Sequence, residues 1–128
     1  WIYVDGDHSY DAVLSDLEAF APKIKQGGLI LGHDYANYPG TEELNYGVIK
    51  AVDAFLSSSR FDFLALTAEG HATFVLGDSS DTVVSDNIAA KIIYNVSAVV
   101  EIRDFIGEQF HQKVFRFPDN ERRLVFSV

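Results

Sequence analysis

Apolar positions in the first third of the chain predict a strand, a helix and a second strand. Residues 1–4 form a continuous apolar run, which is typical of a strand buried on both faces of a parallel sheet. Apolar side chains then recur at helical spacing at Tyr10, Val13, Leu14, Leu17, Phe20, Ala21 and Ile24. We expect Pro22 to shorten or kink this helix and Gly27-Gly28 to end it. Because residues 29–31 are apolar again, the pattern indicates a strand–helix–strand unit with parallel strands and a right-handed crossover.

The middle of the chain predicts a second helix and a strand hairpin. The apolar stripe of this helix consists of Val48, Ile49, Val52, Phe55 and Leu56. We expect Thr41 or Asn45 to cap it, since both side chains can accept a hydrogen bond from a free backbone N–H. Residues 61–68 and 72–77 are apolar runs separated by a short polar segment, which favours two strands of a hairpin.

The last third of the chain is harder to interpret. Residues 86–111 roughly keep helical spacing, but they are rich in β-branched residues, so we expect either one long helix or two short ones. Residues 113–128 predict a second hairpin, with its turn at residues 118–121.

Composition narrows the classes of protein and partner. The chain has 128 residues, of which 48% are hydrophobic, and this suits one globular domain with a real core. A net charge of -9 gives no general attraction for nucleic acid or an anionic membrane, so neither is an expected partner. The absence of cysteine excludes disulfides and thiolate metal ligands. No apolar run is long enough for a transmembrane helix and no signal-peptide pattern is present, so we expect a cytoplasmic location.

The chain begins directly with an apolar run, without a polar lead-in, and contains no methionine. Chain ends are usually polar and poorly ordered. We therefore expect that the N-terminal part of a larger fold precedes residue 1.

Two polar clusters follow the first two predicted strands. One is Asp5-Gly6-Asp7-His8 and the other is His33-Asp34. Ligands of open parallel sheets bind just beyond the carboxyl ends of the strands, so Asp5 and Asp34 could reach a common ion. Two carboxylates suit magnesium, or manganese if a histidine joins them. A structural interpretation stays open, because Asp residues often end strands by capping the next helix, and Asp7 in particular could do only that.

The two other histidines, His71 and His111, fall in a predicted turn and near a predicted helix end. We expect both to be in contact with solvent rather than with the site.

The segment "YVDGDHSYDAVLSDLEAFAPKIKQGGLILGHDY" resembles the second half of class I S-adenosylmethionine-dependent methyltransferases. The pair of motifs "DGDHSY" and "GGLILGHDY" is most similar to small-molecule O-methyltransferases of the macrocin, cephalosporin and catechol types. The resemblance covers residues 1–77 and implies a Rossmann-like α/β fold. It further implies a mostly parallel sheet with a terminal antiparallel hairpin, here lacking its N-terminal strands. Residues 78–128 then form a helical segment and a hairpin that extend the same domain.

The resemblance also implies a function and a site. The expected function is metal-assisted transfer of a methyl group from S-adenosylmethionine to the hydroxyl of a small molecule. The implied ligands of magnesium or another divalent cation are Asp5, His33 and Asp34. His8 falls where related enzymes carry the group proposed to accept the hydroxyl proton, and a histidine suits that role.

The implied cofactor-binding residues are Asp5, Gly6 and Asp7. Tyr10 and Tyr35 could line the acceptor pocket or belong to the core.

One departure from the family pattern limits this interpretation. The chain lacks the glycine-rich first turn and the acidic end of the second strand that hold most of S-adenosylmethionine in such enzymes. We therefore expect the chain alone to bind this cofactor poorly or not at all, and whether it is active by itself stays open. Exposed strand edges and apolar faces favour a homodimer.

Two other functions stay open. A non-catalytic module that keeps the fold for oligomerisation or binding would also lack the cofactor machinery. A metal-dependent hydrolase would use similar Asp and His clusters, but it needs more His and Asn ligands than this chain offers at strand ends.

Overall fold

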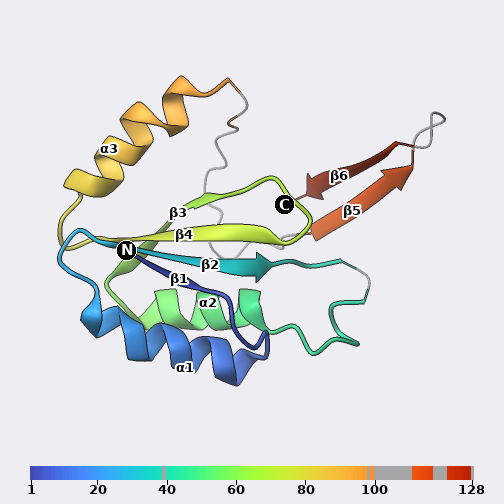
Figure 1. Cartoon of the computed structure of the whole chain (residues 1–128), viewed down its shortest axis with the longest axis horizontal. Coiled ribbons are helices and arrows are strands. Elements are labelled where there is room, and N and C mark those ends of the chain that lie inside the picture. Colours follow the sequence, from blue (N-terminus) through green and yellow to red (C-terminus); the bar gives the residue numbers. More distant parts are fainter. Residues whose placement is uncertain (39, 98, 100–110, 117–120, 128) are drawn as a thin grey trace.

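The structure is a computed structural model, and it describes residues 1–38, 40–97, 99, 111–116 and 121–127. Its helices and strands follow in the order β1 (Ile2–Val4), α1 (Tyr10–Phe20), β2 (Leu29–Tyr35), α2 (Val48–Ser58), β3 (Phe61–Leu66), β4 (Ala72–Asp78), α3 (Val83–Lys91), β5 (His111–Arg116) and β6 (Arg122–Ser127) (Figure 1). Short 3-10 helices span Ala21–Lys23 and Ile93–Asn95. None of the helices in these residues is long and apolar enough to cross a membrane.

The main sheet has four strands in the order β1-β2-β4-β3. β1 and β2 are parallel, as predicted, because α1 connects them as a crossover. The pairs β2–β4 and β3–β4 are antiparallel, so the expectation of a mostly parallel sheet is wrong for the described strands. The reason is that β4 lies between β2 and β3 and runs antiparallel to both, and the short connection from β3 to β4 sets that direction. The mixed α/β sheet is still compatible with a Rossmann-like methyltransferase fold.

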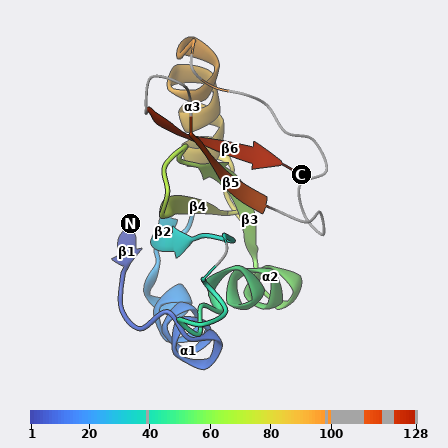
Figure 2. The ribbon, with the colours of Figure 1, turned by 90° about the vertical axis from the view of Figure 1, so that its right-hand side faces the viewer.

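The core lies between the sheet and the two helices α1 and α2, which pack side by side on one face (Figure 2). α3 lies on the opposite side of the sheet in both views. The largest fully buried side chains of the core come from one helix position on each of α1 and α2 and from the facing strands: Leu17, Ile30, Val52, Phe74 and Leu76. This packing fixes the ends of β1 and β2 relative to the start of both helices.

Glycine and proline decide where the helices begin and end. α1 stops at Phe20 and continues as a 3-10 turn with Pro22 near its start, which confirms the predicted shortening. The N-cap of α2 is Gly47 rather than Thr41 or Asn45, so that expectation is wrong. A side chain at position 47 would meet the backbone of Tyr10 at 2.4 Å, so the close approach of the two helix starts requires glycine.

The second strand is longer than its apolar run. β2 extends to Tyr35 and therefore contains Gly32, His33 and Asp34, which the sequence placed after the strand. Its pairing with β4 shifts register between Gly32 and Tyr35, and Asp34 has a positive φ of 61°. The irregularity lies at the residues that carry the polar cluster, which is where such bulges often re-aim a side chain.

The structure confirms part of what the sequence predicts for the last third of the chain. Residues 83–95 form α3 and a 3-10 turn, and the remainder of the expected helical region at residues 100–110 lies outside the described residues. β5 and β6 form the predicted antiparallel hairpin. Most of its expected turn, residues 118–120, also lies outside them.

Candidate functional site

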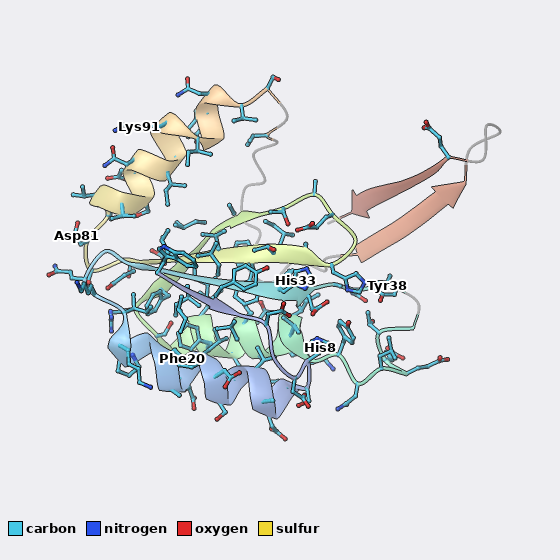
Figure 3. All side chains as sticks on the ribbon, in the orientation of Figure 1. His8, Phe20, His33, Tyr38, Asp81 and Lys91 are labelled. Atoms are coloured by element: carbon cyan, nitrogen blue, oxygen red, sulfur yellow. The ribbon has the colours of Figure 1, made fainter. Side chains whose placement is uncertain are left out.

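The two predicted carboxylates come together at one end of the sheet. Asp5 follows β1 directly, and Asp34 lies on β2, which pairs with β1 up to the contact of Val4 with Gly32. One ligand atom from each of Asp5, His8 and Asp34 lies within 4.8 Å of the others. This is a spacing at which three side chains can share one ion. Figure 3 shows His8 and His33 at this same end of the sheet.

Asp34 is the centre of the cluster. It is only 4% exposed, yet its carboxylate contacts three imidazoles and a phenol. Oδ2 lies 2.9 Å from Nε2 of His8 and 3.2 Å from Nδ1 of His33. Oδ1 lies 2.7 Å from Nδ1 of His71 and accepts a hydrogen bond of 3.3 Å from the hydroxyl of Tyr46. The positive φ of Asp34 is rare for a residue other than glycine, and strain of this kind is common at functional sites.

The surroundings of Asp34 keep it ionised. Burial alone raises the pKa of the Asp34 carboxyl, but the hydrogen bond from His71 and the charges of the His8, His33 and His71 imidazoles outweigh burial and hold that pKa below its usual value. An ionised carboxylate only accepts hydrogen bonds. Asp34 is therefore available as an anionic ligand at neutral pH.

Asp5 and His33 form the more open side of the cluster. The Asp5 side chain is 52% exposed, and its Oδ1 lies 3.7 Å from Nδ1 of His33. His33 thus lies within reach of both carboxylates, and its role as a ligand stays a prediction. The three ligand atoms that all lie within 4.8 Å of one another nevertheless come from Asp5, Asp34 and His8 rather than His33.

His8 is fixed by its backbone and leaves its ring accessible. Its carbonyl accepts a hydrogen bond of 2.8 Å from the N–H of Gly47, at the start of α2. Its ring lies 4.7 Å from that of Tyr46, centroid to centroid, and its side chain is 39% exposed. A small molecule can therefore approach the imidazole from solvent.

The predicted cofactor residues Gly6 and Asp7 lie at the rim of the site. Asp7 accepts a hydrogen bond of 2.7 Å from the N–H of Ser9, and the hydrogen bonds with Ser9 lower the pKa of the Asp7 carboxyl. Ser9 is the N-cap residue of α1 and makes no side-chain cap bond, so Asp7 orders the entry into this helix.

The size of a small cavity at the site limits which groups the site can hold. The lining of this cavity includes Asp5, His8, His33 and Asp34 of the cluster, together with Val4, Gly6, Asp7, Val13, Val48 and Phe74. The cavity measures about 10 Å³. This is room for about one water molecule, and a bare divalent ion is no larger. The oxygen and imidazole donors therefore fit a divalent cation. S-adenosylmethionine is far larger than this cavity, so the cavity itself holds only a group about the size of a water molecule or an ion.

The sequence missed two residues of the cluster. His71 is in contact with solvent, as expected, but the expectation that it lies away from the site is wrong, because its Nδ1 binds Asp34. Tyr46 was not considered as a partner. No local signal marks His71: it comes near Asp34 only because β4 pairs with β2, with Ala72 opposite Tyr35. His111 is the first residue of β5, and its side chain lies outside the described set.

The two tyrosines that could line an acceptor pocket or belong to the core differ in burial. Tyr35 is buried and packs edge-on against the rings of Phe63 and Phe74, so it belongs to the core. Tyr10 is the first residue of α1 and its side chain is partly exposed.

Comparison with known proteins gives one match. The model of a family described as a methyltransferase domain matches residues 1–35. The matched segment spans β1, α1 and β2 and includes Asp5, His8 and Asp34. Neither the comparison with curated proteins nor that with solved structures found a match. The one match supports a methyltransferase domain, and its segment supplies Asp5, His8, His33 and Asp34 of the cluster but not His71 or Tyr46.

Proposed function

We propose that the chain supplies the metal-binding and proton-accepting part of an O-methyltransferase that acts on the hydroxyl of a small molecule. The observation that supports this proposal most is the meeting of Asp5, His8 and Asp34 at the ends of two parallel strands. The methyltransferase-domain match to the same residues supports methyl transfer as the reaction class.

In this proposal Asp5, His33 and Asp34 hold a divalent cation. Carboxylate oxygens suit magnesium, and the imidazole of His33 makes manganese an equally good occupant. When bound, such an ion supplies a positive charge that lowers the pKa of a hydroxyl near it. Asp34 provides a buried anchor for the ion, whereas the exposed Asp5 leaves the opposite side open to a substrate.

His8 is the proposed acceptor of the hydroxyl proton. Its Nε2 lies against the ionised carboxylate of Asp34, so an N–H at this atom has a partner and Nδ1 is left as the basic atom. Asp34 then fixes the tautomer and orientation of the ring, as carboxylates do for histidine bases in other enzymes. The same spacing also permits His8 to replace His33 as a metal ligand. The two roles of His8, proton acceptor or metal ligand, predict different effects of removing His8 on metal affinity.

The experiment that tests the function measures methyl transfer directly. The chain is incubated with S-adenosylmethionine carrying a radioactive methyl group, a panel of phenols and alcohols, and Mg²⁺, Mn²⁺ or EDTA. S-adenosylmethionine is supplied in large excess, because the sequence predicts weak binding of this cofactor by the chain alone. The proposal expects transfer to a hydroxyl that EDTA abolishes and that Asp34→Asn lacks. Transfer that persists in EDTA contradicts the metal-assisted reaction.

A non-catalytic module is the second candidate, and the small size of the cavity favours it. Calorimetry with S-adenosylhomocysteine separates the two. Binding that is detectable and strengthened by the metal supports the transferase, whereas no binding together with no transfer supports the module.

A further inference from the structure

His71 reaches the cluster from a distant part of the chain. It lies in the connection between β3 and β4, and its Nδ1 is 2.7 Å from Oδ1 of Asp34, the shortest of the contacts that the imidazoles make with this carboxylate. Because the Asp34 carboxylate can only accept, Nδ1 of His71 carries the proton and donates.

The two oxygens of Asp34 face different partners. Oδ1 binds His71 and Tyr46, which leaves Oδ2 turned toward His8 and His33, on the side where Asp5 also lies. A carboxylate without such a fixed partner could rotate and present either oxygen. The division of partners therefore sets which oxygen points to the proposed ion.

We propose that His71 is a positioning residue, which holds Oδ1 of Asp34 so that Oδ2 stays aimed at the ion between Asp5 and Asp34. This inference rests on the proposed function in one respect, the role of Asp34 as a metal ligand. Partners of this kind that orient a ligating carboxylate typically change metal affinity 10- to 100-fold.

The setting of His71 suits this role better than a role in folding. Its side chain is 45% exposed and lies in a hairpin connection, outside the buried core. Its ring nevertheless contacts three others at the site, with centroids 5.7 Å from Tyr38, 6.1 Å from His33 and 6.3 Å from Tyr46. These contacts hold the imidazole in place while leaving the core independent of it.

Electrostatics provides a way to recognise positioning. Replacing His71 by alanine removes, at most, a positive charge, and this change alone strengthens the attraction of the site for a cation. A loss of affinity in the alanine variant is therefore opposite in sign to the effect of charge. Such a loss therefore reports the lost hydrogen bond from His71 that orients the Asp34 carboxylate.

The experiment measures Mn²⁺ binding to the full chain by the electron paramagnetic resonance signal of free Mn²⁺. The variants are His71→Ala, His71→Asn, whose amide can replace the Nδ1 donor, and Tyr46→Phe. We expect roughly 10- to 100-fold weaker binding for His71→Ala, recovery of most of the affinity in His71→Asn, and a smaller loss for Tyr46→Phe. Thermal unfolding of His71→Ala should stay close to that of the wild type.

Three outcomes overturn the inference. Equal Mn²⁺ affinity of His71→Ala and the wild type shows that Asp34 needs no such hold, and it leaves the proposed function intact. Equal losses in His71→Ala and His71→Asn show that hydrogen bonding is not the cause. No Mn²⁺ binding by the wild type overturns the metal site of the proposed function together with this inference.

Discussion

The backbone N–H of Gly47 donates a hydrogen bond of 2.8 Å to the carbonyl of His8, and this contact joins the start of α2 to the loop that carries the imidazole. The two segments approach so closely that a Cβ at position 47 would lie 2.4 Å from the backbone nitrogen of Tyr10. The location of His8 thus depends on a glycine far from it in the sequence.

Gly47→Ala should therefore destabilise the fold. The clash is with backbone atoms, which cannot turn away as a flexible side chain can, so we expect a loss of about 1–3 kcal/mol in the free energy of unfolding. Urea denaturation measures it. Gly70→Ala is the matched control, because no atom lies within 4 Å of a Cβ at that position. Equal stability of the two variants would contradict the close approach.

Arg60 and Asp78 form a structural ion pair at the other end of the sheet. Nε of Arg60 lies 3.0 Å from Oδ2 of Asp78, whose side chain is fully buried, and the guanidinium also donates to the carbonyls of Ala21 and Ile24. Arg60→Ala leaves a buried carboxylate without its cation, so we expect a loss of about 2–3 kcal/mol in the free energy of unfolding. Arg60→Lys keeps the charge but not all the hydrogen bonds, and it should lie between alanine and wild type. A chemical denaturation series that shows no loss for alanine rules the pair out as a stabilising contact.

Stability should fall in acid because of two carboxylates. Burial raises the pKa of Asp78, but hydrogen bonds from Ser80 and the contact with Arg60 outweigh it and hold the pKa of Asp78 below its usual value, as the imidazoles do for Asp34. A carboxyl whose pKa is lower in the folded chain adds stability above its ordinary pKa, near 3.8, and that stability is lost as the pH falls through the folded value. Asp34→Asn and Asp78→Asn should each flatten the decline of the thermal midpoint below about pH 4. An unchanged decline in both variants contradicts the lowered pKa values.

Removing His8 separates its two possible roles. If His8 accepts the proton, His8→Ala slows methyl transfer by roughly 10²–10⁴-fold while the affinity for Mn²⁺ stays nearly unchanged. His33→Ala, which removes a proposed ligand, should instead weaken Mn²⁺ binding. Measured side by side, transfer rates and calorimetric affinities decide the matter: a loss of Mn²⁺ affinity in His8→Ala makes His8 a ligand and contradicts its assignment as base.

The strand–helix–strand unit and the first hairpin could be predicted because their signals are local. The helical stripe of α1 faces the core as predicted, and Pro22 shortens α1, which ends before Gly27-Gly28 rather than at them. The expectation that the apolar run of residues 1–4 is buried on both faces is wrong, because β1 is an edge strand of the described sheet and Trp1 and Tyr3 are exposed. The order of the strands could not be predicted in this way, since it depends on β4 inserting between β2 and β3. That choice is made by packing across the whole sheet, and it is the reason the sheet is not mostly parallel.

The candidate site, like the fold, has residues that could be predicted from the sequence and residues that could not. Asp5, His8 and Asp34 could be proposed from strand ends, because the carboxyl ends of neighbouring parallel strands must meet. His71 and Tyr46 could not, because each reaches Asp34 only after the hairpin and the loop before α2 have folded over the end of β2. Their contribution is tertiary, and the sequence around each residue carries no sign of it.

The central claim is that Asp5 and Asp34 share one divalent ion, and calorimetric titration of the chain with Mn²⁺ tests it most directly. Asp5→Asn and Asp34→Asn each remove one proposed ligand, and Asp11→Asn, an exposed residue in the first turn of α1, removes the same charge outside the cluster. The account predicts that the wild type and Asp11→Asn bind one ion per chain with similar affinity, whereas both other variants bind it roughly tenfold more weakly or worse. Equal affinity in all three variants, or no binding by the wild type, would contradict the claim.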